Sequence, residues 1–197
     1  MSANDSPYLA EGPRVGIRHL AYEDAGEFTA RVRESRDLHR PWLFPPDTAE
    51  VYDRYARARI EHADVESFLV CEREAGGAIA GFITINNIVR AAFLNGTLGY
   101  GAFAHAVGRG LMSEGLGLVL AYAFGPLGLH RLEANIQPLN EASLALVRRA
   151  GFRLEGYSPA MLFIDGAWRD HERWAITSDM RTGGHPTRYD FRKEPGR

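Results

Sequence analysis

The hydrophobic positions of this chain follow two different periods. Ala25, Phe28 and Val32 recur at the spacing of a helix, whereas Leu132, Ala134 and Ile136 alternate as in a buried strand. The pattern predicts strands at 15–20, 67–72, 78–86, 97–103, 131–136, 153–164 and 168–177. It predicts helices at 22–36, from about Asp47 onward, from the glycines at 108 and 110 to 124, and at 140–150.

Dipeptides that contain glycine mark two of the turns between these elements. Gly76 and Gly77 join two of the strands, and Asp165-Gly166 is the strongest hairpin signal in the chain. The order is a run of antiparallel hairpins followed by a strand-helix-strand-helix-strand passage. We therefore expect a mixed α/β (α+β) sheet whose ligand lies where the strands' carboxyl ends meet helix N-termini.

A single domain accounts for most of the chain. We expect a flexible N-terminus over 1–12, one domain over 13–178 and a polar C-terminal tail over 179–197, where glycines and prolines outnumber apolar anchors. A chain of 197 residues can bury roughly 70% of its extended surface, so its core needs no disulfide or structural metal.

Composition narrows the functional classes. A formal net charge of −2 argues against a general nucleic-acid binder, and Cys71, as the only cysteine, excludes an internal disulfide and favours the cytoplasm. The longest apolar run, 116–129, is broken by glycines and a proline and is shorter than the ~20 residues that span a bilayer. We see no secretory signal at the N-terminus. Lys193 is the only lysine among 23 basic residues, which suggests a GC-rich bacterial genome.

The most informative segment is 108–112, at the start of the helix that follows the strand 97–103. Backbone N–H groups of Gly108, Arg109, Gly110, Leu111 and Met112 would face outward where the helix dipole supplies roughly half a positive charge. Glycine lets an anion approach, and the arginine could add its charge, so the segment could cradle a pyrophosphate. By itself it fits an ordinary tight turn as well, because it completes neither a P-loop nor a Gly-x-Gly-x-x-Gly motif.

The wider pattern resembles the GNAT superfamily of acetyl-CoA-dependent N-acetyltransferases. Their signature is Gln/Arg-x-x-Gly-x-Gly/Ala, and its fixed positions fall on Val107, Gly110 and Met112, two of which depart from the consensus. The closer resemblance, over about residues 80–175, is to the RimJ/RimL-type branch, which acetylates N-termini of ribosomal proteins. The matching segments are Asn87-Ile88-Val89-Arg90, Leu98-Gly99-Tyr100, 108–112 with Glu114, His130-Arg131, Asn140-x-x-Ser143, Gly151-Phe152, and Ile164-Asp165-Gly166-x-Trp168.

This resemblance implies a GNAT fold, a splayed and mostly antiparallel sheet flanked by helices, with acetyl-CoA in the gap. The backbone of Tyr100, Gly101 and Ala102 would pair with pantetheine like an added strand. Val107 and 108–112 would hold the pyrophosphate. Asn140 and Ser143 would face the thioester, although Asn140 also fits a plain helix N-cap.

The resemblance also implies candidates for catalysis. Many GNAT enzymes carry a proton-donating tyrosine where Val147 stands, which leaves Ser143 as the nearest hydroxyl for the sulfur. Glu114 is a candidate base, but its place in the first helical turn also fits a structural role. His39 and His105 are more simply surface histidines. No spacing of His, Cys or acidic residues suggests a metal site.

The loop 41–44 is the candidate acceptor wall. Trp42 and Phe44 could line it together with Tyr100, or could instead pack beneath the loop. We expect direct acetyl transfer to a protein N-terminal amine, with a ribosomal protein as partner and the enzyme as monomer or homodimer. The alternatives are acetylation of a small amine (a polyamine, amino sugar or toxin) and a non-catalytic acyl-CoA sensor. Neither nucleic acid nor membrane is an expected partner.

Overall fold

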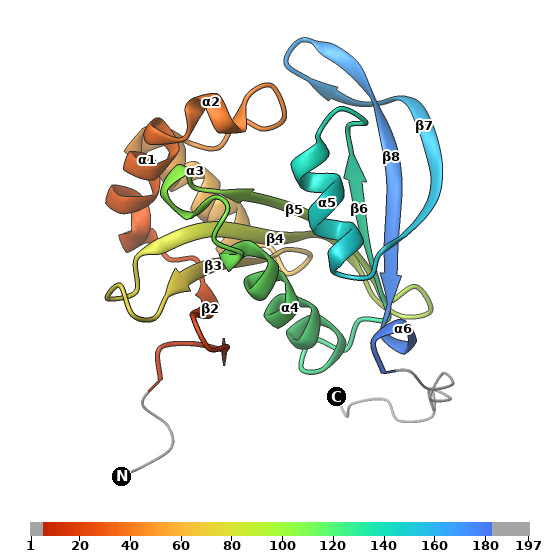
Figure 1. Ribbon diagram of the computed structural model, residues 1–197, viewed down its shortest axis with the longest axis horizontal. Helices are drawn as coiled ribbons and strands as arrows, with labels where there is room; N and C mark the ends of the chain where they lie inside the picture. Colours follow the sequence, from red (N-terminus) through yellow and green to blue (C-terminus); the bar gives the residue numbers. More distant parts are fainter. Residues whose placement is uncertain (1–5, 183–197) are drawn as a thin grey trace.

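Eight strands form one open sheet in the computed structural model, which describes residues 6–182 (Figure 1). The order across the sheet is β1-β2-β3-β4-β5-β6-β8-β7, and every neighbouring pair is antiparallel except β5 and β6. The strands are β1 (Ala10–Glu11), β2 (Val15–His19), β3 (Glu66–Glu72), β4 (Ile79–Val89), β5 (Asn95–Ala102), β6 (Arg131–Ile136), β7 (Arg153–Ile164) and β8 (Ala167–Thr177).

Helices cover both faces of this sheet. The helices α1 (Ala25–Glu34) and α3 (Ala49–Ile60) pack through Phe28 and Tyr52 against the β3 face that carries Leu69 and Cys71. The opposite β3 face, which carries Phe68, belongs to the core shared with α4 (Leu111–Phe124) and α5 (Glu141–Arg149). Alternating strand residues point to opposite faces, so β3 and β4 supply side chains to two separate cores. The short elements are η1 (Tyr22–Asp24), α2 (Arg36–His39), η2 (Ala104–Ala106) and α6 (Ser178–Thr182).

The sheet opens between β5 and β6. These strands pair only from Asn95 with Arg131 to Leu98 with Ala134. Beyond that point β5 stays with β4, as far as Ala102 opposite Gly81, while β6 stays with β8. The second half of β5 therefore has a free edge, and this splay confirms the mixed, mostly antiparallel sheet that the sequence predicts.

Several boundaries differ from the sequence prediction. The helix predicted at 22–36 is three elements: its first turn is the 3-10 helix η1, which runs on into α1, and α1 is separated from α2 at Ser35, whose φ of −106° and ψ of 12° are not helical. The helix predicted from Asp47 begins at Ala49, with Thr48 as the cap that accepts from the Val51 N–H.

Two short elements lie outside the predicted limits of the domain. The strand β1 lies within 1–12 and pairs with β2, and α6 begins at Ser178 and continues to Thr182. The remaining N-terminal and tail positions of that prediction, 1–5 and 183–197, lie outside the described residues. Among residues 6–182, no helix is long and apolar enough to cross a membrane.

Candidate active site

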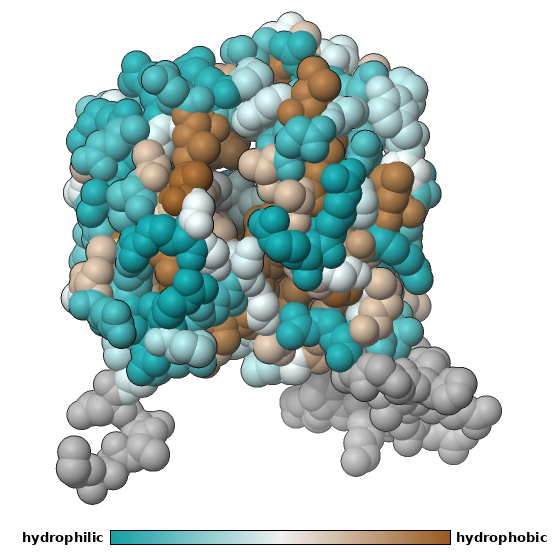
Figure 2. All heavy atoms as spheres, viewed as in Figure 1, coloured by the Kyte–Doolittle hydropathy of each residue, from teal (hydrophilic) through white to brown (hydrophobic). Residues whose placement is uncertain are grey.

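A groove of about 430 Å³ lies where the sheet opens. It is walled by the free part of β5, the N-terminus of α4, one side of α5 along its length and the segment around α2. Figure 2 shows the surface hollowed near the middle of this face, with apolar side chains on both sides. Eleven of the residues that the sequence singles out line the groove: Trp42, Tyr100, Gly101, Ala102, Val107, Gly108, Gly110, Leu111, Met112, Asn140 and Ser143.

The start of α4 has the geometry of an anion cradle. Gly108 and Gly110 adopt φ angles of +77° and +75°, a conformation that glycine takes without steric cost. The helix begins at Leu111, and the N–H groups of its first turn have no partner within the helix. They carry the positive end of the helix dipole, so the groove fits a pyrophosphate at this end.

Arg109 does not contribute its charge to this cradle. Its Nη1 and Nη2 donate to Glu72 Oε1 and Oε2 at 2.8 and 2.6 Å, and its side chain lies outside the groove lining. His105 Nε2 lies 3.5 Å from the same carboxylate. In this structure the Arg109 side chain ties the loop before α4 to β3, and its charge is directed to Glu72 rather than into the groove.

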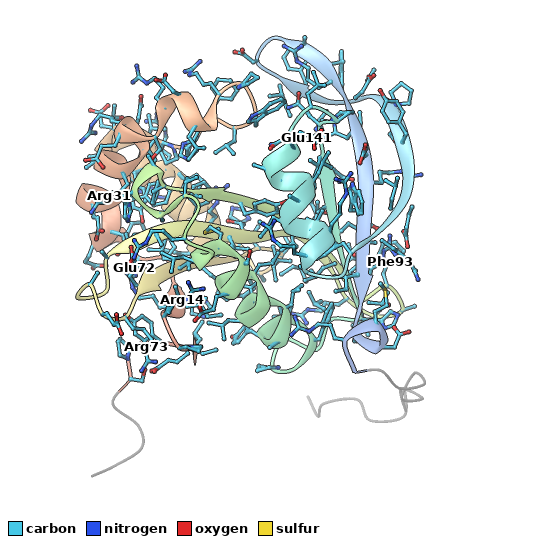
Figure 3. All side chains as sticks on the ribbon, in the orientation of Figure 1. Arg14, Arg31, Glu72, Arg73, Phe93 and Glu141 are labelled. Carbon is cyan, nitrogen blue, oxygen red and sulfur yellow. The ribbon has the colours of Figure 1, made fainter. Side chains whose placement is uncertain are left out.

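Glu114 also points away from the groove. Its Oε1 accepts from the Arg14 and Val15 N–H groups at 2.8 and 3.1 Å, and its Oε2 accepts from Arg14 Nε at 2.8 Å. Burial raises the pKa of this carboxyl, but these hydrogen bonds outweigh burial and leave the pKa below its ordinary value. Figure 3 shows Arg14 and Glu72 beside the start of α4. The structure therefore does not bring the Glu114 carboxylate into the groove; it ties the start of α4 to the segment before β2.

Two hydroxyl groups meet across the opening of the sheet. The Tyr100 hydroxyl on β5 lies 2.6 Å from Ser143 Oγ on α5. Asn140 caps α5 by accepting from the Ser143 N–H at 3.2 Å, which fixes the serine in the first turn. Burial raises the pKa of Tyr100 to about 12, so its hydroxyl stays protonated at neutral pH. Val147 is fully buried in the core and contributes nothing to the groove.

The two aromatic residues of the 41–44 loop have different positions. Trp42 lines the groove and also a second groove of about 420 Å³, which it shares with Tyr157, Trp168 and Asp170. Phe44 lines neither of these two grooves, and its exposed ring stacks under the Arg40 guanidinium at 4.6 Å. Trp42 is therefore placed as the sequence suggests, whereas Phe44 is not.

Sequence reasoning missed two groove residues. His39, interpreted as a surface histidine, is 3% exposed, and burial lowers its pKa. Arg149, in the last turn of α5, lines the groove, and its guanidinium has no ion-pair partner within the described part of the chain. The spacing of residues along α5 does not predict whether Arg149 faces the groove or the solvent. The burial of His39 is visible only once α2 is packed in the folded structure.

Other reactive groups lie away from this groove. Burial raises the pKa of the Cys71 thiol to about 11, and the residue is in the core beneath α1 and α3. Between residues 6 and 182, no three His, Cys, Asp or Glu side chains gather as they would around a metal ion.

Comparison with known proteins decides the family. The acetyltransferase (GNAT) domain family matches residues 14–153. The chain belongs to the GNAT acetyltransferases. Membership confirms both the fold and the class of reaction that the motifs suggest, N-acetyl transfer.

The relatives include the RimJ type that the motifs resemble. The chain is 32% identical to the [ribosomal protein uS5]-alanine N-acetyltransferase of Escherichia coli K12, over 87% of this chain and 91% of the relative. It is 28% identical to RimJ of Mycobacterium smegmatis, solved in complex with CoA-disulfide, with a TM-score of 0.78 over 85% and 87% of the two chains. A more distant relative, at 24% identity over 88% and 91%, is the spermidine N(1)-acetyltransferase of Escherichia coli K12.

Proposed function

We propose that this protein transfers the acetyl group of acetyl-CoA directly to the N-terminal α-amine of a protein, with a ribosomal protein as the acceptor. The observation that carries this proposal is the position of Trp42, which lines both the groove at the splayed sheet and the second groove beside it. A peptide whose first residue reaches Ser143 could lay its following residues in that second groove. The relative that acetylates the uS5 alanine is the named precedent.

The donor end of the groove suits acetyl-CoA. The cradle at Gly108 and Gly110 would receive the pyrophosphate, and the edge of β5 at Tyr100 and Ala102 would pair with the pantetheine amides. The Ala102 carbonyl on this edge already accepts from His39 Nε2, so a pantetheine amide would use its second lone pair. Arg149 is a cation on the same groove and would supply the positive charge toward the phosphates that Arg109, paired with Glu72, directs elsewhere. A phosphate group facing it would gain a charge-assisted hydrogen bond.

The hydroxyl pair would act on the departing sulfur. In the reaction a C–N bond forms, the C–S bond breaks, and negative charge develops on sulfur. Because the Tyr100 hydroxyl stays protonated, it can donate to Ser143 Oγ, and the serine can then donate its own proton toward the sulfur. Hydrogen bonds aimed at developing charge lower the barrier more than those that already form in the ground state.

The acceptor amine must be neutral to attack. The titratable side chains that line the groove are His39, Tyr100 and Arg149, so the proton of the amine would leave through water. An α-amine with a pKa of about 8 costs only ~1.4 kcal/mol to deprotonate at pH 7, whereas a lysine amine costs about 4.6 kcal/mol. A site of this kind therefore favours N-terminal amines over the ε-amine of lysine.

The proposed acceptor also implies a cellular location and a set of partners. We place the protein in the cytoplasm, where acetyl-CoA and newly made ribosomal proteins are both present. We expect it to act as a monomer or homodimer, without nucleic acid or membrane as a direct partner.

The test is acetylation of defined acceptors. The purified protein would be incubated with acetyl-CoA and either N-terminal peptides of ribosomal proteins or spermidine, and release of free CoA would be followed. We expect turnover of at least one peptide and little of spermidine. Turnover of small amines alone would replace the proposal with the polyamine reading, and tight CoA binding without any turnover would indicate a sensor.

A further inference from the structure

His39 joins the acceptor side of the groove to the donor side. Its Nε2 lies 2.8 Å from the carbonyl oxygen of Ala102, at the end of β5. Its own backbone oxygen accepts from the N–H groups of Trp42 and Leu43 at 2.9 and 3.0 Å. The backbone of His39 therefore holds the loop that carries Trp42, and its side chain holds the strand that carries Tyr100.

The carbonyl of Ala102 faces the open part of the sheet. The next residue, Phe103, donates its N–H to Ala80 on β4 at 2.9 Å. Successive residues of a strand direct their N–H and C=O groups to opposite sides, so those of Ala102 point toward the gap left by β6. The first half of β5 pairs with β6, but Ala102 lies beyond that pairing. Its carbonyl therefore accepts from His39 instead of from a neighbouring strand.

The hydrogen bond fixes the tautomer of the ring. A carbonyl oxygen can only accept, so Nε2 carries the hydrogen and Nδ1 of the neutral ring is an acceptor. Nδ1 is buried and has no partner among the described residues. An apolar side chain could pack against Phe82 and Phe103 without burying an unpaired nitrogen. Packing alone therefore does not explain a histidine at this position.

A second tie one helical turn earlier repeats the arrangement. Ser35, four residues before His39 and equally buried, accepts the N–H of Ala104 at 2.9 Å and donates to Arg31 O at 2.6 Å. Ser35 and His39 therefore attach the segment between α1 and the 41–44 loop to Ala104, which opens η2, and to Ala102, which ends β5.

We propose that His39 is a positioning residue that sets the distance between the acceptor wall at Trp42 and the thioester end of the groove at Tyr100 and Ser143. This inference rests on the proposed function, because it concerns how that site aligns its two substrates. His39 does not touch the reacting atoms. It holds the two walls so that amine and thioester meet in a reactive geometry, and a misplacement of about 1 Å costs on the order of a hundredfold in rate.

Paired substitutions separate the hydrogen bond from packing. In His39→Gln the side-chain amide can still donate to Ala102 O, whereas His39→Leu fills similar space without a donor. We expect His39→Leu to lower kcat with the peptide acceptor by about ten- to a hundredfold and His39→Gln to stay within about fivefold of the wild type. The control is His62→Gln, an exposed histidine outside the groove. Wild-type kcat in a folded His39→Leu variant, or equal losses in both variants, would overturn the proposal.

A second readout does not depend on activity. Nitrogen NMR of the free protein should show His39 with a slowly exchanging Nε2–H and an unprotonated Nδ1. The Trp42 and Leu43 amides bond to the backbone oxygen of residue 39, which leucine keeps, so their loss of exchange protection in His39→Leu would report that the segment loosens once its tie to Ala102 is gone. A freely exchanging Nε2–H in the wild type would contradict the inference. If the wild type acetylates no amine but keeps this Nε2–H, the proposed function fails and the hydrogen bond stands.

Discussion

The Tyr100 hydroxyl lies 2.6 Å from Ser143 Oγ, and this contact bridges β5 and α5 where the sheet has come apart. The contact therefore places a pair of protonated hydroxyl groups in the lining of the groove, 43 positions apart in the sequence.

The first prediction concerns this pair. Ser143→Ala should lower kcat by about ten- to a hundredfold with little change in acetyl-CoA affinity, because the serine would bond to sulfur only as charge develops. Tyr100→Phe should lower kcat less, since the phenol acts through the serine. In the Ser143→Ala background, Tyr100→Phe should have almost no further effect, and a double-mutant cycle measures this coupling. Fully additive losses would show that the two hydroxyls act separately.

The second prediction concerns the anion cradle. Gly108→Ala strains a residue whose φ is +77° but adds no charge, and a Cβ there meets no atom within 4 Å. Gly108→Glu adds the same strain and a carboxylate that repels phosphate. Calorimetry should therefore show a modest loss of CoA affinity for alanine and a loss of at least about a hundredfold for glutamate. Gly117→Ala, in the middle of α4 with open space around it, is the control and should bind CoA normally.

The third prediction concerns the cation on α5. Arg149→Gln should raise the KM for acetyl-CoA by about tenfold while kcat stays near that of the wild type, since a phosphate contact contributes equally to ground and transition states. The rise should shrink at high salt, which screens an exposed pair. Arg54→Gln, an exposed arginine of α3 away from the groove, controls for general charge effects. An unchanged KM in Arg149→Gln would remove this residue from the donor site.

The fourth prediction compares the two loop aromatics. Trp42→Ala should raise the KM for a peptide acceptor by about tenfold or more, because the indole lines both grooves along which the peptide would lie. Phe44→Ala removes an exposed ring that lines neither of them and should leave that KM within about twofold. Steady-state kinetics with peptides of increasing length would measure both. Equal effects of the two substitutions would argue against Trp42 as the acceptor wall.

The fifth prediction concerns Glu114. Glu114→Gln should leave kcat nearly unchanged and lower the free energy of unfolding at pH 7 by about 1–2 kcal/mol, since it weakens the bonds to Arg14 and Val15. The folded-state pKa of this carboxyl lies below its unfolded value, so its stabilisation is present above pH ~4.5 and is lost as the pH falls through the folded pKa. Urea unfolding at pH 7 and below pH 4 should thus show a difference between wild type and variant that shrinks with acid. A large fall in kcat would restore Glu114 as a catalytic group.

The parts of the site that a sequence can show are those built locally. The glycines before α4 and the Asn140 cap act on their immediate neighbours, so their spacing along the chain is enough to place them. The family motifs add the strand at Tyr100 and the serine at 143.

The partners of charged side chains could not be read in the same way. Arg109 meets Glu72 and Glu114 meets Arg14 only because β2 and β3 lie beside the start of α4 in the folded sheet. A helix N-terminus attracts any nearby carboxylate, and the sequence alone does not say whether that carboxylate serves structure or catalysis. The burial of His39 likewise depends on how α2 lies against the end of β5.

The acceptor amine is the central claim, and one measurement tests it most directly. A ribosomal N-terminal peptide that also contains a lysine would be incubated with the enzyme and acetyl-CoA, and fragmentation mass spectrometry would locate the acetyl group. We expect acetylation at the N-terminal α-amine, because about a tenth of that amine is neutral at pH 7 against far less of a lysine. Acetylation of the lysine side chain, or of spermidine in preference to the peptide, would contradict it.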